Sequence, residues 1–290
     1  MGILTKRAGS SGSVSGSSSG DSPPAMAFAS FPAASSVSGQ RLRASDLANA
    51  VFASDGTRWR PEGGRQIIAP VVGRPIYIAP TGSVAANGAL TLGTALLSAQ
   101  KCWMYLPAGA AYAGSTANFY YVDLSTTLLG TVYNNIYTPT LRNWDFPTSP
   151  TPIVDAGPGA YTGVIAQVTA IDIAIPANLM GPSGQLSAYN RQLYTNSAGS
   201  KTLRHKLGGT IFAQKASTTS AIVGFTASVG NLGVTDAQIA SNVGDTGTVT
   251  NGVNLPVINT TAATNLVYTL EHAVDTDWIG LVGAYLELIA

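Results

Sequence analysis

The side chains in this sequence that could carry acid–base or metal chemistry are few and widely separated. Both histidines, His205 and His272, fall in strand-like segments, and neither stands near the single cysteine, Cys102. Without the close spacing that metal ligands show, structural roles are favoured over catalysis. Cys102 has apolar and aromatic neighbours within residues 101–106, which predicts a buried structural thiol rather than a nucleophile.

The carboxylates do not indicate an enzyme either. Asp123, Asp145 and Asp155 could form the acid pair of a glycan-cleaving enzyme. Nothing in the sequence brings them together, and the long repetitive β-helix on which such depolymerases rest is not indicated. Residues 157–163 are rich in glycine but lack the lysine of a phosphate-binding loop, so they predict a turn. We therefore expect a protein that is not an enzyme and uses no metal and no cofactor.

The composition favours a protein that works inside an assembly. Charged residues make up 10% of the 290 residues and apolar residues 45%, whereas soluble domains usually have about 25% charged residues. Such an exterior suits a chain that is covered by neighbours or by copies of itself. The net charge of +1 gives no electrostatic reason to expect nucleic acid as a partner.

No targeting or membrane-spanning segment is predicted. No stretch approaches the run of about 18 apolar residues that reads as a membrane span. The first residues carry positive charge, but residues 8–20 are glycine and serine where a signal peptide would be apolar. We expect a chain that is made and assembled without secretion and without membrane insertion.

The last third of the sequence gives the clearest strand signal. In Lys201–Leu207 the two leucines and the histidine share one face, which predicts a half-buried strand. The opposite face carries Thr202, Arg204 and Lys206. Gly208-Gly209 supplies the positive φ values of a two-residue hairpin turn, and residues 210–215 read as the returning strand. Further strands are predicted at residues 221–229, 265–271 and 277–289.

The final predicted strand is apolar on both faces. Strict alternation puts Ile279, Leu281, Tyr285 and Ile289 on one face and Trp278, Val282, Leu286 and Leu288 on the other. Such a strand needs cover on both sides, either from a second sheet of the same chain or from another copy. We expect residues 176–290 to form an antiparallel β-sandwich of jelly-roll type.

A first β domain is predicted at residues 76–175. Asn87-Gly88 lies between apolar runs as a hairpin turn should, and residues 119–124 and 130–137 are aromatic and β-branched. The proline-rich stretch 138–159 is expected to be a long ordered loop. It carries four residues that could contact either a receptor or a neighbouring subunit: Arg142, Trp144, Asp145 and Phe146.

Residues 1–40 are interpreted as an extended arm. Residues 10–20 are almost pure serine and glycine, which is typical of a flexible linker. The residues that follow suggest an arm that orders when it docks on a partner, with Met26, Phe28 and Phe31 as apolar anchors. A tag or linker remnant is the alternative, which the continuing apolar residues disfavour.

Residues 41–75 read as a short helix and a connector. Ser45 could cap a helix over residues 46–52, and Asp55-Gly56 is a strong turn signal. Three arginines surround Trp59. They could bind phosphate or an acidic glycan, or they could stack on Trp59 and pair with nearby carboxylates, and the second interpretation is favoured. The residues concerned are Arg58, Arg60 and Arg65, with Asp55 and Glu62 as the carboxylates.

At these residues the sequence resembles a known class. Residues 55–61, read Asp-Gly-Thr-Arg-Trp-Arg-Pro, with Gly63-Gly64-Arg65 after them, are similar to a connector in tail fibres and other virion fibre proteins of tailed bacteriophages. Residues 82–92, 105–110, 119–121, 130–135, 201–204 and 206–210 resemble the β-rich modules of the same proteins. The resemblance implies a homotrimeric, non-enzymatic virion component. Because no heptad or collagen-like repeat is present, a compact appendage or adaptor is expected rather than a long rod.

The sequence thus predicts an all-β chain: two jelly-roll-like β-sandwich domains in series after an arm and a short helix, assembled as a trimer. Its expected function is that of a tail-fibre or tail-tip component, anchored by its N-terminus and in contact with a host surface glycan or protein. A head-decoration fibre or tail adaptor that binds only virion proteins is one alternative. A glycan-degrading tailspike is another, and loss of cleavage on replacing Asp145 would support it.

Overall fold

The computed structural model describes residues 22–71, 75–108, 116–139, 146–153, 159–219, 222–244, 248–250 and 253–290. Within these ranges the chain is built of strands, and its helical turns are the short 3₁₀ segments Phe28–Ser30, Ala34–Ser36 and Glu62–Gly64. The expectation of an all-β chain is confirmed. The jelly-roll arrangement and the trimer stay predictions. In the described residues no helix is long and apolar enough to cross a membrane.

The N-terminal part forms a small four-stranded sheet. Its order is β1 (Ala25–Met26), β2 (Arg41–Ala44), β3 (Ala50–Ser54) and β4 (Trp59–Pro61), with β1 parallel to β2. The helix expected at residues 46–52 is wrong. Ala48 and Asn49 have φ values of 55° and 61°, which no right-handed helix accommodates, and the chain turns there to start β3. The predicted Asp55-Gly56 turn is confirmed, because Gly56 has φ 85° between β3 and β4.

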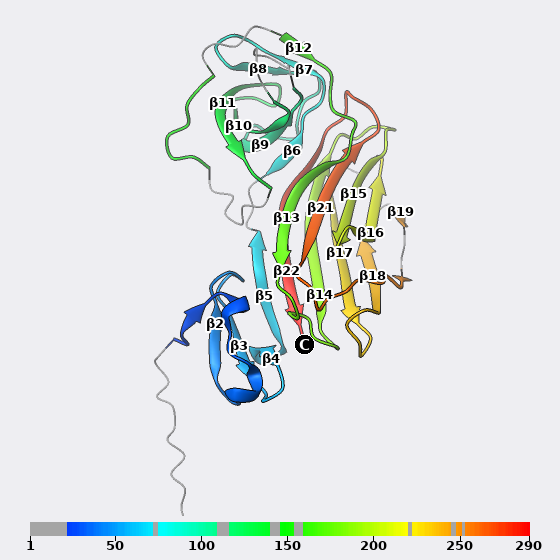
Figure 1. The fold of residues 1–290 in the computed structure, drawn as a ribbon. Helices are drawn as coiled ribbons and strands as arrows, with labels where there is room; N and C mark the ends of the chain where they lie inside the picture. The colour runs from blue at the N-terminus through cyan, green and yellow to red at the C-terminus, as the bar shows by residue number, and fades with distance from the viewer. Residues whose placement is uncertain are drawn as a thin grey trace, which may run out of the picture.

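The C-terminal part is a sandwich of two facing sheets (Figure 1). One sheet has the order β13 (Val168–Ile175), β21 (Thr264–His272), β15 (Lys201–Leu207), β16 (Thr210–Ser217), β19 (Thr248–Thr250). The other contains, in order, β22 (Ile279–Ile289), β14 (Gln185–Tyr194), β17 (Ile222–Asn231), β18 (Gln238–Gly244) and β20 (Val253–Asn254), and β5 (Arg65–Val71) pairs with β22. The hairpin at Gly208-Gly209 is confirmed, with both glycines at positive φ.

The final strand is covered by its own chain. A β-bulge at Val282, where Gly283 pairs with Arg191 and Leu281 with Gln192, shifts the alternation by one residue. Ile279 and Leu281 before the bulge therefore join Leu286 and Leu288 after it in one buried cluster. The assignment of two apolar faces by strict alternation was wrong for this reason, and of the two kinds of cover expected for this strand the structure shows the intrachain one.

The region between these parts folds around a second core. A curved sheet runs through β12 (Gly159–Tyr161), β7 (Gly82–Val84), β8 (Ala89–Leu92), β11 (Leu129–Tyr137), β10 (Asn118–Leu124), β9 (Lys101–Leu106) and β6 (Ile76–Ile78). It encloses the buried cluster that includes Cys102, Tyr120 and Trp278. Because β6 also pairs with β22, this sheet continues into the sandwich. The sequence predicts residues 168–175 in the first β domain, but strand β13 pairs with β21 of the sandwich.

Candidate functional site

The proposed docking residues lie on the small N-terminal sheet. Met26 belongs to β1, and the backbone N–H of Phe28 donates to Asp46 Oδ1 at 2.8 Å. The ring of Phe31 lies 5.9 Å from that of Phe52 and 4.9 Å from that of Trp59, measured between centroids. The aromatic anchors are thus half-buried against their own chain, and they also line a cavity of about 520 Å³ beside Pro32, Arg58, Ala177 and Asn178.

The arginines around Trp59 do not converge on a common ligand position. Arg60 pairs with Asp55, and Arg65 lies 3.3 Å from Glu287. Hydrogen bonds from the backbone of Arg58, from Arg60 and from the backbone of Thr57 hold the pKa of Asp55 well below its usual range. The interpretation as carboxylate pairing is supported for Asp55, whereas Glu62 pairs with Arg41 at 2.7 Å instead.

Of the four residues proposed for receptor or subunit contact, the structure describes one. Phe146 is half-buried, and its ring lies 5.2 Å from that of Tyr121 and 6.1 Å from that of Trp103. These contacts favour packing within the chain for Phe146. Arg142, Trp144 and Asp145 lie outside the described residues, so their role stays a prediction.

The residues first considered for chemistry are buried or separated. Cys102 is fully buried, and burial raises the pKa of its thiol. Burial lowers the pKa of His205 to about 3, so its imidazole is neutral and accepts from Asn190 at 2.8 Å. Asp123 lies 4.0 Å from Lys101 on the surface, while Asp145 and Asp155 lie outside the described residues. No cluster of three or more metal-ligating side chains occurs in the described ranges.

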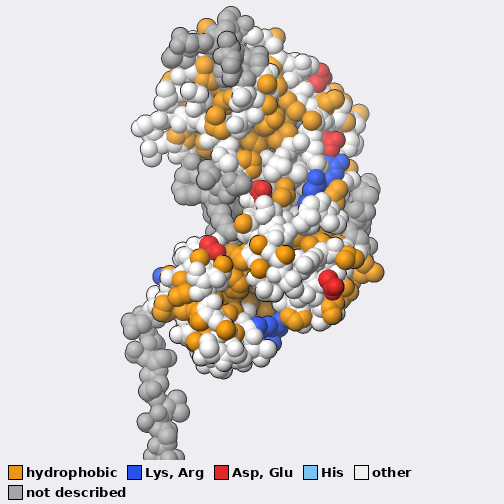
Figure 2. All heavy atoms as spheres, viewed as in Figure 1, with side chains coloured by type: hydrophobic (Ala, Val, Ile, Leu, Met, Phe, Trp, Pro, Cys, Tyr) orange, Lys and Arg blue, Asp and Glu red, His pale blue; other side chains and the backbone are white. Residues whose placement is uncertain are grey.

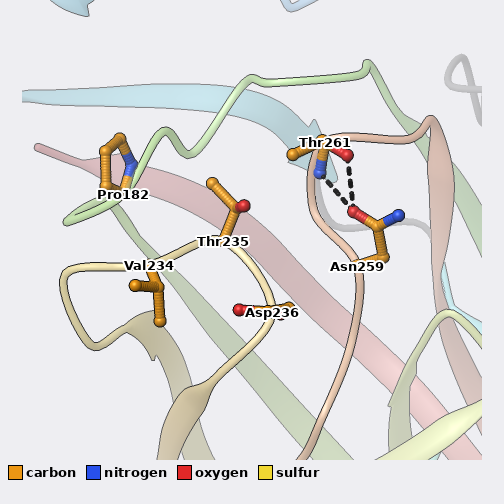
Figure 3. A pocket seen from close by; sticks show the side chains of 6 residues that line it. All are labelled: Pro182, Val234, Thr235, Asp236, Asn259 and Thr261. Carbon is orange, nitrogen blue, oxygen red and sulfur yellow. Dashed lines mark hydrogen bonds between the residues drawn. The ribbon is translucent and has the colours of Figure 1, made fainter.

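A more promising site lies at the end of the sandwich, where three loops meet. A cavity of about 660 Å³ opens between residues 176–184, the turn between β17 and β18, and the segment before β21 (Figure 3). We call it the loop cavity. Its lining combines one carboxylate, an amide and hydroxyl groups with two apolar side chains: Pro182, Val234, Thr235, Asp236, Asn259 and Thr261.

Buried amides hold these three loops together. Gln238 is fully buried, donates from Nε2 to the carbonyl of Ile258 at 2.9 Å and accepts at Oε1 from the N–H of Ile258 at 2.8 Å. It also donates to Asn231 Oδ1 at 2.9 Å, and Asn231 donates in turn to Thr260 Oγ1 at 2.9 Å. Thr260 Oγ1 donates to the carbonyl of Thr235 at 2.8 Å. The network gives the cavity walls a defined geometry before any ligand arrives.

The loop cavity presents several hydrogen-bonding groups to a ligand. Asn259 Oδ1 accepts from both the backbone N–H and the hydroxyl of Thr261, at 3.0 and 2.6 Å (Figure 3). Asp236 supplies the carboxylate among the described lining residues. Hydroxyls, an amide and a carboxylate can hydrogen-bond a polyhydroxylated or a peptide ligand. Sequence reasoning missed this site, because its residues come from three separate segments.

Exposed apolar side chains lie on β18, in the turn before it and in the segment after β20. Val257 is 78% exposed, Leu255 and Val243 are each 71% exposed. We call the full set the apolar edge: Leu232, Val234, Ile239, Val243, Leu255 and Val257. Figure 2 shows that on the viewed face charged side chains form a few isolated spots among hydrophobic and uncharged polar atoms.

Comparisons with known proteins find little similarity to this chain. No family model matches the chain, and no curated protein matches it. Among solved structures it is similar to the CBM2 module of the evolved Dit of Lactobacillus casei BL23 phage J-1, with a TM-score of 0.27 and 13% identity, over 44% of this chain and 75% of that one. At this TM-score the likeness does not establish a shared fold.

Proposed function

We propose that this chain is a non-enzymatic structural subunit of a tailed-bacteriophage virion, assembled as a homotrimer in the host cytoplasm. The observation that carries the proposal is the apolar edge, where aliphatic side chains up to 78% exposed lie on β18, in the turn before it and in the segment after β20. Large exposed apolar patches mark surfaces that another protein covers. The low share of charged residues, 10%, agrees with an exterior that is covered in an assembly.

The short sequence motifs support the virion over other assemblies. The connector at residues 55–65 and the β-rich motifs that follow resemble fibre proteins of tailed phages, and the chain is all-β as that resemblance implies. We place the N-terminal arm at the virion and the C-terminal sandwich outward, as a tail-fibre or tail-tip component. Three copies of a weak site would bind a host surface by avidity.

The loop cavity is the part of the outward sandwich that best fits a ligand. Its walls are fixed by the Gln238–Asn231–Thr260 hydrogen bonds, and its polar groups suit a host surface glycan or protein loop. A head-decoration fibre or tail adaptor that binds only virion proteins is the second candidate. The apolar edge favours it equally, because that edge could be covered by a different virion protein.

Native mass measurement tests the assembly. We expect a species of three times the chain mass of 29.6 kDa. A stable monomer at micromolar concentration would contradict the trimer. Binding of the full-length protein to a glycan array then separates the two candidates. Glycan binding that Asp236→Ala weakens supports host contact. No binding to glycans or to host cells, together with binding to virion proteins, supports the adaptor.

A further inference from the structure

A lysine and an aspartate meet inside the sandwich, away from every site described above. Lys201 Nζ lies 3.0 Å from Asp277 Oδ2, and the two side chains are 0% and 4% exposed. Lys201 begins β15 in one sheet, while Asp277 lies two residues before β22 in the other. The pair therefore bridges the two sheets at a point closed to water.

The surroundings hold both groups in place. Ser197 Oγ donates to Asp277 Oδ2 at 2.7 Å, and Lys201 Nζ donates to the carbonyl of Gly199 at 2.8 Å. A Cβ added at Gly199 would lie 2.4 Å from Asp277 Oδ2, so glycine is needed there for the carboxylate to approach this turn. The amine nitrogen and the carboxyl group thus stand in contact, which is the arrangement that gives intramolecular reactions high effective molarities.

A buried base lies opposite Lys201 on the neighbouring strand. His272 is the direct cross-strand partner of Lys201 in the β15–β21 pairing. Its Nδ1 lies 2.8 Å from the carbonyl oxygen of Val274, which can only accept, so Nδ1 carries the hydrogen and Nε2 carries the lone pair. Nε2 is buried and has no hydrogen-bond partner in the described part of the chain. Burial lowers the pKa of His272, which keeps that lone pair available at neutral pH.

We propose that Lys201 and Asp277 condense to an intramolecular amide that covalently joins the two sheets. The Nζ–Cγ bond forms, and one Cγ–O bond of the carboxylate breaks. The ammonium gives up two protons, both of which reach the departing oxygen and leave with it as water. Ser197 Oγ accepts from Lys201 Nζ at 2.5 Å and donates to Asp277 Oδ2 at 2.7 Å, so its hydroxyl relays protons from the nitrogen to that oxygen and ends unchanged. The free lone pair of His272 Nε2 assists the loss of the proton from Nζ.

The carbonyl oxygens around Nζ stabilise its charged ammonium form. A base is therefore needed to remove a proton before the nitrogen can attack. The carbonyl oxygens of Ser197 and Thr218, each at 3.3 Å, join that of Gly199 in stabilising the ammonium form. These three carbonyl oxygens also fix the orientation of Nζ. Exclusion of water opposes the reverse reaction, because hydrolysis of the amide requires water to enter a site whose side chains are at most 4% exposed.

Intact mass spectrometry of the denatured full-length protein tests the proposal. We expect wild-type protein, after incubation at neutral pH, to be lighter than its sequence by one water molecule. Fragmentation should yield a branched peptide that joins Lys201 to Asp277. Lys201→Arg and Asp277→Ala should keep the full mass, and His272→Gln should form the cross-link at least tenfold more slowly.

The surface pair Lys101–Asp123 is a matched control in the same molecule. Its side chains are 59% and 39% exposed and lie 4.0 Å apart, so no cross-link is expected there. Full mass in wild-type protein after prolonged incubation overturns the proposal, and this result does not depend on any variant folding. A dehydrated but unbranched peptide at Asp277 also overturns it, and an unchanged rate in His272→Gln overturns the role of that base.

Discussion

Asn190 Nδ2 lies 2.8 Å from His205 Nε2 in the middle of the sandwich, and both side chains are fully buried. Because Asn190 belongs to β14 and His205 to β15, this hydrogen bond joins the two sheets. The ring of His205 lies against Phe212, Phe225 and Tyr268, and burial raises the pKa of Tyr268, so none of these neighbours is charged at neutral pH. A protonated imidazole would find no counterion among them.

Acid should therefore destabilise the fold through His205. Its pKa is about 3 in the folded chain and about 6.5 when unfolded, so between these values the unfolded state binds more protons and the free energy of unfolding falls as pH falls. From pH 7 to pH 4.5 we expect a loss of roughly 2–3 kcal/mol. Urea denaturation at both pH values measures it.

His205→Gln is the control for this pH dependence. The glutamine can accept from Asn190 but does not titrate, so its stability should change less over the same interval. His272, whose pKa burial also lowers, contributes in the same direction and remains in the variant. Equal losses in wild type and variant would show that His205 is not the group responsible.

The sequence predicted the parts of the fold that local chemistry determines. The Gly208-Gly209 hairpin was predictable because two adjacent glycines allow two successive positive φ values, observed at 57° and 82°. The helix at residues 46–52 was wrongly predicted because Asn49 adopts a left-handed conformation that a capping pattern does not indicate. The face assignment of β22 failed after Val282, because a bulge is fixed by pairing with β14.

The candidate site could not be predicted in the same way. The loop cavity is lined by residues from three separate segments, and Asn231, Gln238 and Thr260 come together only through the strand pairing. Phe28 and Phe31 were recognised as apolar anchors, but sequence could not tell that Phe52 and Trp59 would be their partners. Both the loop cavity and the partners of these rings depend on contacts between residues far apart in the sequence.

Two glycines of β22 should respond differently to alanine. A Cβ at Gly280 would lie 2.3 Å from ring carbons of Tyr77, whose ring is fixed by Trp278 at 5.6 Å and by a 2.7 Å hydrogen bond from Gln100. Gly280→Ala should cost about 1–3 kcal/mol through overpacking. Gly283 has nothing within 4 Å of an added Cβ, so Gly283→Ala should be neutral or slightly stabilising. Denaturant midpoints compare the two, and equal effects would contradict the argument.

Gln238 should be the residue on which the loop cavity depends. Gln238→Ala leaves the N–H and carbonyl of Ile258 and the Oδ1 of Asn231 without this partner. We expect a loss of about 2–4 kcal/mol and faster hydrogen exchange in residues 255–261. Ser241→Ala, which removes the exposed 2.8 Å contact with Ser228, serves as the control and should change stability by less than about 0.5 kcal/mol. Unchanged exchange in Gln238→Ala would show that the loops are held by other contacts.

Two truncations separate the docking role of the arm from its packing role. Removal of residues 1–21 should leave the small sheet intact, because it keeps Phe28 and Phe31 in contact with Phe52. Removal of residues 1–40 also takes away Phe28 and Phe31 and exposes Phe52, which is fully buried. Trypsin should then cleave within residues 41–65 at least tenfold faster. Equal cleavage of both truncations would mean that residues 22–40 do not hold the sheet. Incorporation into particles of the protein that lacks residues 1–40 would contradict docking by the arm.

Glutamate substitutions on the apolar edge test whether assembly covers it. Val243 is 71% and Val257 78% exposed in the single chain, so Val243→Glu and Val257→Glu should leave the unfolding transition of the isolated chain nearly unchanged. If a second chain covers these positions, each variant buries an unpaired carboxylate in the contact, and the dissociation constant should rise by at least about tenfold. Sedimentation velocity across a concentration series measures this dissociation constant. Leu129→Glu is the matched control, since Leu129 is 48% exposed on the first β domain, away from this edge. Wild-type assembly in both edge variants would place the subunit contact elsewhere on the molecule.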